Sequence, residues 1–107
     1  MQQITAHMLD QWLRDDSRGQ PVLLDVREGW EFQHCHIAGS VHIPMHEIPS
    51  RLNEIDDEVD TVVICHHGMR SMQVAQYLER AGFGRVHNLQ GGVDAWSRDI
   101  DPSVPFY

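Results

Sequence analysis

Short apolar runs alternate with sets of apolar residues at helical spacing along this chain. The clearest runs are residues 22–26 and the segment from Thr61 that ends on Cys65. Continuous runs of this kind are typical of strands buried on both faces of a parallel sheet. Shorter strands are expected at 41–43, which stops at Pro44, and at residues 86 to 89. The alternation of strands and helices predicts an α/β fold with a mostly parallel sheet covered on both sides.

Helical periodicity predicts the segments between these strands. A first helix at 4–16 opens near a candidate cap, Thr5, and a second helix occupies 71–81 with Gly82 at the position of a C-terminal cap. Residues 27–34 form a short helix or an ordered loop. The apolar face of the first helix comprises Met8, Leu9, Trp12 and Leu13. Two weaker helical patterns follow later in the chain, one formed by Ile48, Leu52 and Ile55 and the other by Val93 and Trp96.

Length and charge narrow the possible functions. The 107 residues are enough for one core, so we predict a single domain over 1–107, with its core at about 4–99 and an extended surface tail at 100–107. The net charge is 8 − 16 = −8, and the chain contains no lysine. This composition excludes Schiff-base chemistry and argues against nucleic acid or an anionic membrane as a partner.

The beginning of the sequence shows no basic segment followed by an apolar stretch, and no run has the length of a membrane span. We therefore expect a cytoplasmic protein in which the two cysteines, Cys35 and Cys65, stay reduced. Asp56, Asp57, Glu58 and Asp60 read as a solvated acidic turn.

Cys65 lies at the carboxyl end of a predicted strand and shortly before a predicted helix. Unpaired amide N–H groups and the dipole at the start of a helix favour an anion, which here is the thiolate of Cys65 itself. Gly68 allows the intervening loop to adopt a positive φ and to bring successive amides inward. Arg70 adds a fork of donors suited to an oxyanion. We therefore predict that Cys65 is a nucleophile rather than a buried structural cysteine.

Four segments in order carry a family resemblance: 24–28 (LDVRE), 36–44 (HIAGSVHIP), 65–71 (CHHGMRS) and 89–96 (LQGGVDAW). Together they resemble the single-domain rhodanese, or thiosulfate sulfurtransferase, family over nearly the whole chain. The resemblance implies a rhodanese-like three-layer α/β/α domain with a five-stranded, mostly parallel central sheet. It also implies a double displacement in which Cys65 takes the outer sulfur of thiosulfate, releases sulfite and passes the sulfur from a persulfide to cyanide or a thiol. No cofactor is expected.

The resemblance further implies that the six-residue loop from Cys65 to Arg70 cradles the persulfide through backbone amides. Related phosphatases and arsenate reductases separate their cysteine and arginine by five residues. Here four residues separate them, which suits a sulfur atom better than a phosphate group. A second alternative, a non-catalytic rhodanese-fold module that binds a partner protein, is disfavoured because the cysteine and arginine are intact. The expected substrate-binding residues are His66, His67, Gly68, Met69, Arg70 and Ser71.

His66 and His67 have two interpretations. In the first, one of them is an imidazolium that helps to hold thiosulfate or the thiolate. In the second, both are exposed loop residues that shape the access of the acceptor. The expected donor is a small anion such as thiosulfate. The acceptor is cyanide or a thiol, with thioredoxin and a sulfur-carrier protein among the candidates, and the protein is expected to be a monomer.

Three residues are predicted to be structural supports. Asp25 would accept hydrogen bonds from the loop beside the next strand end, Arg27 would pair with Glu28 or Glu31, and His36 belongs to the structural motif of the family. No metal site is expected, because the spacing of the nearby cluster matches no standard zinc pattern. That cluster consists of His34, Cys35, His36, His42 and His46.

Cys35 is predicted to be an inert core residue rather than one that resolves a persulfide on Cys65 into a disulfide. The three tryptophans, Trp12, Trp30 and Trp96, are expected in the core or at its rim.

Overall fold

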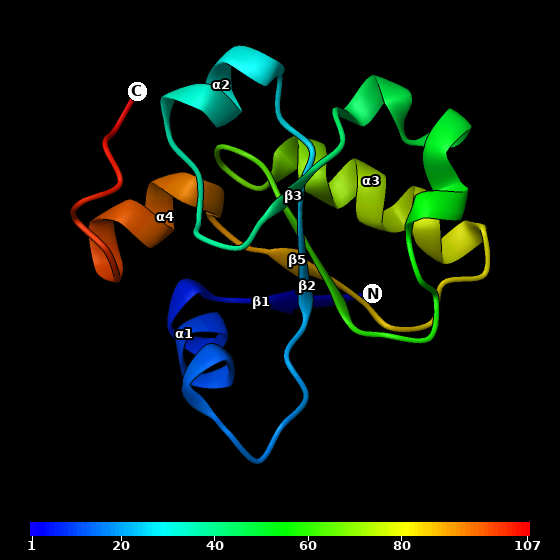
Figure 1. Cartoon of the computed structure of the whole chain (residues 1–107), viewed down its shortest axis with the longest axis horizontal. Helices are drawn as coiled ribbons and strands as arrows, with labels where there is room; N and C mark the ends of the chain where they lie inside the picture. Colours follow the sequence, from blue (N-terminus) through cyan, green and yellow to red (C-terminus); the bar gives the residue numbers. More distant parts are fainter.

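The centre of the computed structural model, which describes all residues 1–107, is a five-stranded sheet (Figure 1). All of its strand pairings are parallel. The strands, in the spatial order β1-β5-β4-β2-β3, are β1 (Gln2–Ile4), β5 (Val86–Leu89), β4 (Thr61–Ile64), β2 (Val22–Asp25) and β3 (Val41–His42). The predicted fold class is therefore confirmed. The sequence pattern missed β1, which is only 3 residues long.

Helices cover both faces of this sheet (Figure 1). Helix α1 and helix α4 pack on one face, whereas α3 and two 3-10 segments pack on the other. Their bounds are α1 (Ala6–Arg14), α2 (Gly29–His34), η1 (Met45–Glu47), η2 (Pro49–Glu54), α3 (Met69–Arg80) and α4 (Gly92–Asp99). The helical pattern expected around residues 48–55 is thus a 3-10 segment, which is interrupted at Arg51 (φ −123°). None of the helices combines the length and the apolar character that a membrane crossing requires.

Strand β4 and Cys65, which directly follows it, contribute side chains to both apolar cores of the molecule. Its side chains alternate between the two faces of the sheet, as the pleat of a strand requires. Val62 and Ile64 pack with α1 and α4, whereas Val63 and Cys65 pack with α3. All four side chains are essentially inaccessible to water, which explains why the strand appears in the sequence as an uninterrupted apolar run.

The start of α1 confirms the predicted cap. The Thr5 side chain accepts a hydrogen bond from the backbone N–H of Met8 at 3.1 Å. Met8 itself was wrongly assigned to the apolar face, because its side chain is 49% exposed. Trp30 was also expected in the core or at its rim, but it is 64% exposed and touches the ring of Tyr107 edge-on.

The tail after α4 does not simply run along the surface. Val104 is buried in the core beneath α1 and α4. The chain then turns back toward α2, where Tyr107 meets the loop that follows Cys65. The extended surface tail predicted for 100–107 is therefore wrong at these two residues.

The carboxyl ends of β2, β4 and β5 lie at one edge of the sheet, where α2, α3 and α4 begin. In Figure 1 the loop between β4 and α3 lies between α2 and α4 at this edge. Ligand sites of parallel α/β sheets form at such an edge, because the loops and helix starts of neighbouring strands converge there.

Candidate active site

The Cys65 sulfur lies inside the loop that joins β4 to α3. Its Sγ atom accepts a hydrogen bond from the Gly68 N–H at 3.0 Å and lies 3.3 Å from the Ser71 hydroxyl. Gly68 adopts the positive φ (+102°) that the sequence predicted for it. The N–H groups of residues 66, 67 and 69–71 have no acceptor within the protein. The loop and the first turn of α3 therefore carry five backbone N–H groups without an internal acceptor, next in sequence to the one that binds the sulfur, and such free donors favour an anion.

Helix α4 fixes the opposite side of the loop. The N–H groups of Val93 and Asp94 donate to the carbonyl oxygens of Cys65 and His66 at 2.9 and 3.0 Å. In a trans peptide the N–H points away from the C=O, so the N–H groups of His66 and His67 face away from α4. This approach requires glycine at position 92, where a Cβ atom would stand 2.3 Å from the Cys65 oxygen.

A buried asparagine connects the loop to the edge of the sheet. The Asn88 side chain accepts a hydrogen bond from the Ser71 hydroxyl and donates to the Gly68 carbonyl at 3.2 Å and to Gln3 at 2.8 Å. A hydroxyl has a single proton, and that of Ser71 is directed at Asn88, so its oxygen is free to accept from the Cys65 thiol. When Cys65 ionises, the same hydroxyl can turn to donate to the thiolate.

Arg70 is held by Glu31, a buried residue of α2. The two guanidinium nitrogens donate to the two carboxylate oxygens at 2.7 and 2.9 Å, which is a bidentate pair. Arg70 lowers the pKa of Glu31 to about 2, although burial alone would raise it. Glu31 in turn raises the pKa of Arg70. The predicted fork of donors is therefore engaged by a carboxylate of the protein.

The predicted supports Asp25 and Arg27 form a buried pair with each other. The Arg27 guanidinium donates to the Asp25 carboxylate at 2.8 Å, and both side chains are completely buried. Burial would lower the pKa of Arg27, but Asp25 and Tyr107 raise it. The expected pairing of Arg27 with Glu28 or Glu31 is wrong, as are the expected bonds from the loop to Asp25. The reason is local, because the backbone turn after β2 brings Arg27 back onto the carboxylate two residues earlier.

Tyr107 joins these two ion pairs. Its hydroxyl accepts from Arg27 at 2.8 Å and donates to Glu31 at 2.8 Å. Burial raises the pKa of this hydroxyl to about 12. The ring stacks on His66 with 4.0 Å between ring centroids. The side chain thus covers one side of the loop and links it to β2 and α2.

His66 and His67 stack on each other at 3.9 Å between ring centroids. Burial and the neighbouring His67 lower the pKa of His66, so its imidazole is neutral at neutral pH. This favours the interpretation in which His66 shapes access to the sulfur over the one in which it acts as an imidazolium. His67 is exposed to solvent.

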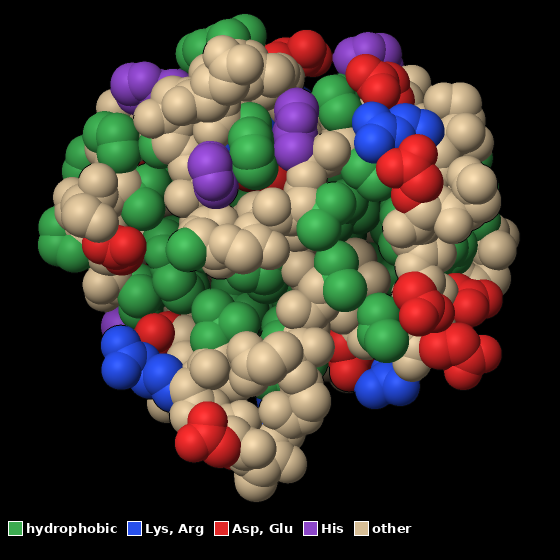
Figure 2. All heavy atoms as spheres, in the orientation of Figure 1, with side chains coloured by type: hydrophobic (Ala, Val, Ile, Leu, Met, Phe, Trp, Pro, Cys, Tyr) green, Lys and Arg blue, Asp and Glu red, His purple; other side chains and the backbone are tan.

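His36 stacks on Phe32 at 3.9 Å, and its Nδ1 atom lies 2.8 Å from the Phe32 carbonyl oxygen. His42 also stacks on the Phe32 ring, with 4.6 Å between ring centroids. Figure 2 shows histidine side chains gathered on this side of the molecule near α2. These contacts are consistent with a structural role for His36 in positioning the segment after α2.

Cys35 lies apart from Cys65. Its side chain is buried in the core beneath α1 and α4, on the face of the sheet opposite the core that holds Cys65. The Cys35 thiol donates to the Pro105 carbonyl oxygen at 3.5 Å. Both cysteines are free, and the position of Cys35 agrees with an inert core residue.

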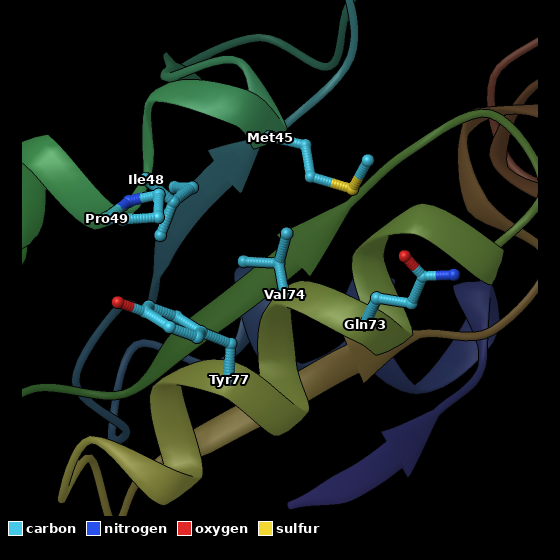
Figure 3. Close-up of a pocket in the computed structure, with 6 residues that line it drawn as sticks. All are labelled: Met45, Ile48, Pro49, Gln73, Val74 and Tyr77. Atoms are coloured by element: carbon cyan, nitrogen blue, oxygen red, sulfur yellow. The ribbon is translucent and has the colours of Figure 1, made fainter.

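One hollow adjoins the candidate site, and another lies away from it. A polar cavity of about 290 Å³ adjoins the loop at His67, Gly68 and Met69, and it extends toward Gln90. A more apolar groove of about 270 Å³ lies between α3 and the 3-10 segments, away from the loop (Figure 3). The groove is lined by Met45, Ile48, Pro49, Gln73, Val74 and Tyr77.

Sequence reasoning missed three residues of this site: Glu31, Asn88 and Tyr107. Asn88 carried a usable signal, because a polar residue near the end of a buried strand beside the cysteine strand needs a polar partner. Glu31 was considered only as a partner of Arg27. Tyr107 carried no signal, since the return of the tail to the loop depends on tertiary packing.

The molecule is thus an α/β protein in which a buried cysteine follows a central parallel strand and begins a loop with unpaired amides. Residues 5–99 match the family model of the rhodanese-like domain. The chain belongs to the rhodanese-like family, as the resemblance predicted.

Named relatives agree with this assignment. The chain is 39% identical over 102 residues to a sulfurtransferase of Allochromatium vinosum, covering 95% of this chain and 94% of that protein. It is 37% identical over 86 residues to the thiosulfate sulfurtransferase GlpE of Actinobacillus pleuropneumoniae, covering 80% of each. The crystal structure of a rhodanese-like domain protein from Staphylococcus aureus superposes with a TM-score of 0.85 at 30% identity, covering 100% of this chain and 99% of that one.

Proposed function

We propose that this protein is a sulfurtransferase that carries a sulfane sulfur as a persulfide on Cys65. The coarser conclusion, that it is a sulfurtransferase, is supported by membership of the rhodanese-like family and by relatives with that name. The persulfide is supported by one observation above all. The buried Cys65 sulfur accepts the Gly68 N–H inside a loop whose other amides are unpaired.

The reaction has two displacements. The Cys65 thiolate attacks the outer sulfur of thiosulfate, a new S–S bond forms, and the original S–S bond breaks as sulfite leaves with its electron pair. A thiolate or cyanide then attacks the outer sulfur of the persulfide, and Cys65 departs as the thiolate. The free amides of the loop stabilise the negative charge on sulfur in both steps. The loop residues His66 to Ser71 act as the substrate-binding residues through their backbone N–H groups, while the Arg70 side chain stays paired with Glu31.

The engagement of Arg70 favours sulfur over phosphate. A phosphatase needs its loop arginine to hold the equatorial oxygens of a phosphoryl group. Here that guanidinium is bound by both oxygens of Glu31, so it is not free to hold a phosphoryl group at the Cys65 sulfur. The negative charge of a persulfide on Cys65 needs only the backbone N–H groups of the loop to stabilise it. The short interval between Cys65 and Arg70 supports the same choice.

The polar cavity beside Gly68 offers the acceptor a route to the loop. A small thiol or cyanide fits this proposal, as does a thiol on thioredoxin or on a sulfur-carrier protein. We further propose that the protein acts as a single-domain monomer in the cytoplasm. Its net charge of −8 disfavours nucleic acid and anionic membranes as partners.

Mass spectrometry of the intact protein tests the proposal. After incubation with thiosulfate, the wild-type protein should gain the mass of one sulfur atom and release one equivalent of sulfite. Cys65→Ser should show neither change, whereas Cys35→Ser, which removes the other buried thiol, should behave as wild type. If wild-type protein gained no sulfur from thiosulfate or from a low-molecular-weight persulfide, the persulfide mechanism would be wrong. A binding module without catalysis predicts equal turnover for wild type and Cys65→Ser.

A further inference from the structure

His66, His67 and Asp94 bring three potential metal ligands together at the rim of the Cys65 loop. One ligand atom from each residue lies within 4.8 Å of the other two. We propose that these residues bind a divalent transition metal ion, with Zn²⁺ as the best match. Two imidazoles and one carboxylate form a donor set that suits Zn²⁺, whereas Mg²⁺ and Ca²⁺ prefer oxygen ligands alone.

The backbone already holds the ligands in one place. Asp94 lies in the first turn of α4, and its N–H donates to the His66 carbonyl at 3.0 Å. The loop and the helix therefore cannot separate without breaking this hydrogen bond. A site whose backbone is fixed before binding loses less conformational entropy when the ion arrives.

The two imidazoles are close together but are not yet oriented toward one ion. The His66 ring stacks on the ring of His67 and on that of Tyr107, with centroid distances of 3.9 and 4.0 Å. Because the lone pairs of stacked rings run side by side, the exposed His67 side chain must rotate out of the stack before both imidazoles bind one ion. The ring nitrogens of His66 and His67 make no hydrogen bond within the protein, so their lone pairs are not committed elsewhere. Arg98 donates to one Asp94 oxygen at 3.3 Å, which orients the carboxylate and leaves its other oxygen free.

An ion can reach this site from solvent, because His67 is exposed and the other two ligands are partly exposed. Three protein ligands leave a fourth position, which we assign to water. The net charge of −8 and the absence of lysine also favour a dication. The sequence alone gave no sign of the site, because Asp94 becomes a neighbour of the histidines only through the packing of α4.

Binding should be measured on the Cys65→Ser protein, in which zinc has no catalytic thiol to bind. Isothermal titration with Zn²⁺ is expected to show one equivalent bound. Asp94→Asn, which keeps the size of the side chain, and His67→Ala, at an exposed position, should each weaken binding at least about tenfold. The matched control is His46→Ala, which removes another exposed histidine that lies 3.6 Å from a carboxylate, that of Glu47. This control should bind as the parent protein does.

The spectrum of Co²⁺ added to wild-type protein identifies the ligands directly. Ligation by the proposed residues gives d–d bands without a thiolate-to-metal charge-transfer band. A strong charge-transfer band would place the metal on a cysteine and overturn the proposal. It would also be overturned if Zn²⁺ failed to bind, or bound equally to the parent, Asp94→Asn and His67→Ala proteins. Because the Cys65→Ser protein cannot form a persulfide, the result does not depend on the proposed sulfur transfer.

Discussion

Replacement of Glu31 by glutamine removes the charge that holds Arg70 but keeps the size of the side chain. The carboxyl has a pKa of about 2, against 4.5 for an unperturbed glutamate. One pH unit of pKa corresponds to about 1.4 kcal/mol, so the full difference corresponds to about 3 kcal/mol. The Arg70 side chain is 33% exposed, and solvent screens the pair. We therefore expect Glu31→Gln to lower the free energy of unfolding by about 1 to 2 kcal/mol at neutral pH.

The pH dependence follows from the direction of this difference. The pKa of Glu31 is lower in the folded protein, so the ion pair contributes its full stability above the unfolded value of 4.5. That contribution is lost as the pH falls from 4.5 toward 2. Urea denaturation of wild type and Glu31→Gln at a series of pH values should therefore show a constant difference near neutrality and a shrinking one under acid conditions.

Glu54→Gln is the matched control for this experiment. Glu54 also binds an arginine through both oxygens, but that pair is on the surface, with 48% of the Glu54 side chain exposed. Exposed pairs contribute little, so this variant should unfold as wild type does. A Glu31→Gln effect that is absent at neutral pH, or that does not shrink on acidification, would refute the reasoning.

Two further changes test the packing around the loop. Gly92→Ala should cost about 2 to 4 kcal/mol in urea denaturation, because position 92 has φ +60° and a new Cβ would meet two loop carbonyls. Gly29→Ala, with open space around it, should leave stability almost unchanged, and equal effects of the two changes would contradict this account. Tyr107→Phe should lower the free energy of unfolding by about 1 to 2 kcal/mol, since it removes a hydroxyl that joins two charged groups. The stability of the wild-type protein should also fall as the pH rises from 10, the ordinary pKa of tyrosine, to about 12, the pKa of Tyr107 in the folded protein. This fall should be absent in Tyr107→Phe. If an ultraviolet titration showed that Tyr107 ionises near pH 10, its burial would be contradicted.

Local patterns predicted most of the fold. The runs of β2 and β4 lie between two layers of helices, so every position in them is apolar except Thr61 and the ion-paired Asp25, and their sequences are distinctive. The cap at Thr5 and the place of Gly82 at the end of α3 are also local features. Both are confirmed, since Gly82 follows the last capping residue of α3 and has a positive φ of +102°. Strand β1 escaped notice because three residues carry no period and their role depends on pairing with β5.

The sequence predicts only the part of the candidate site whose residues are adjacent in the chain. The loop from Cys65 to Ser71 was found because its residues stand together. The partners of that loop come from α2, β5 and the tail, and no spacing rule links Glu31, Asn88 and Tyr107 to the cysteine. The pairing of Arg27 shows most clearly what the sequence cannot predict. Several acidic residues lie near Arg27 in the sequence, and only the backbone turn after β2 determines that it pairs with Asp25.

Strand β1 is the first strand along the chain, yet its one partner in the sheet is β5, the last. Its pairing closes a loop that contains the rest of the sheet, a long-range contact of the kind that forms slowly. Gln3 faces Asn88 in this pairing and hydrogen-bonds its side chain, which in turn holds the Gly68 carbonyl. A nascent chain therefore cannot fix the loop around Cys65 until residue 89 has left the ribosome, so the Cys65 sulfur acquires its final surroundings only after the loop itself has been synthesised.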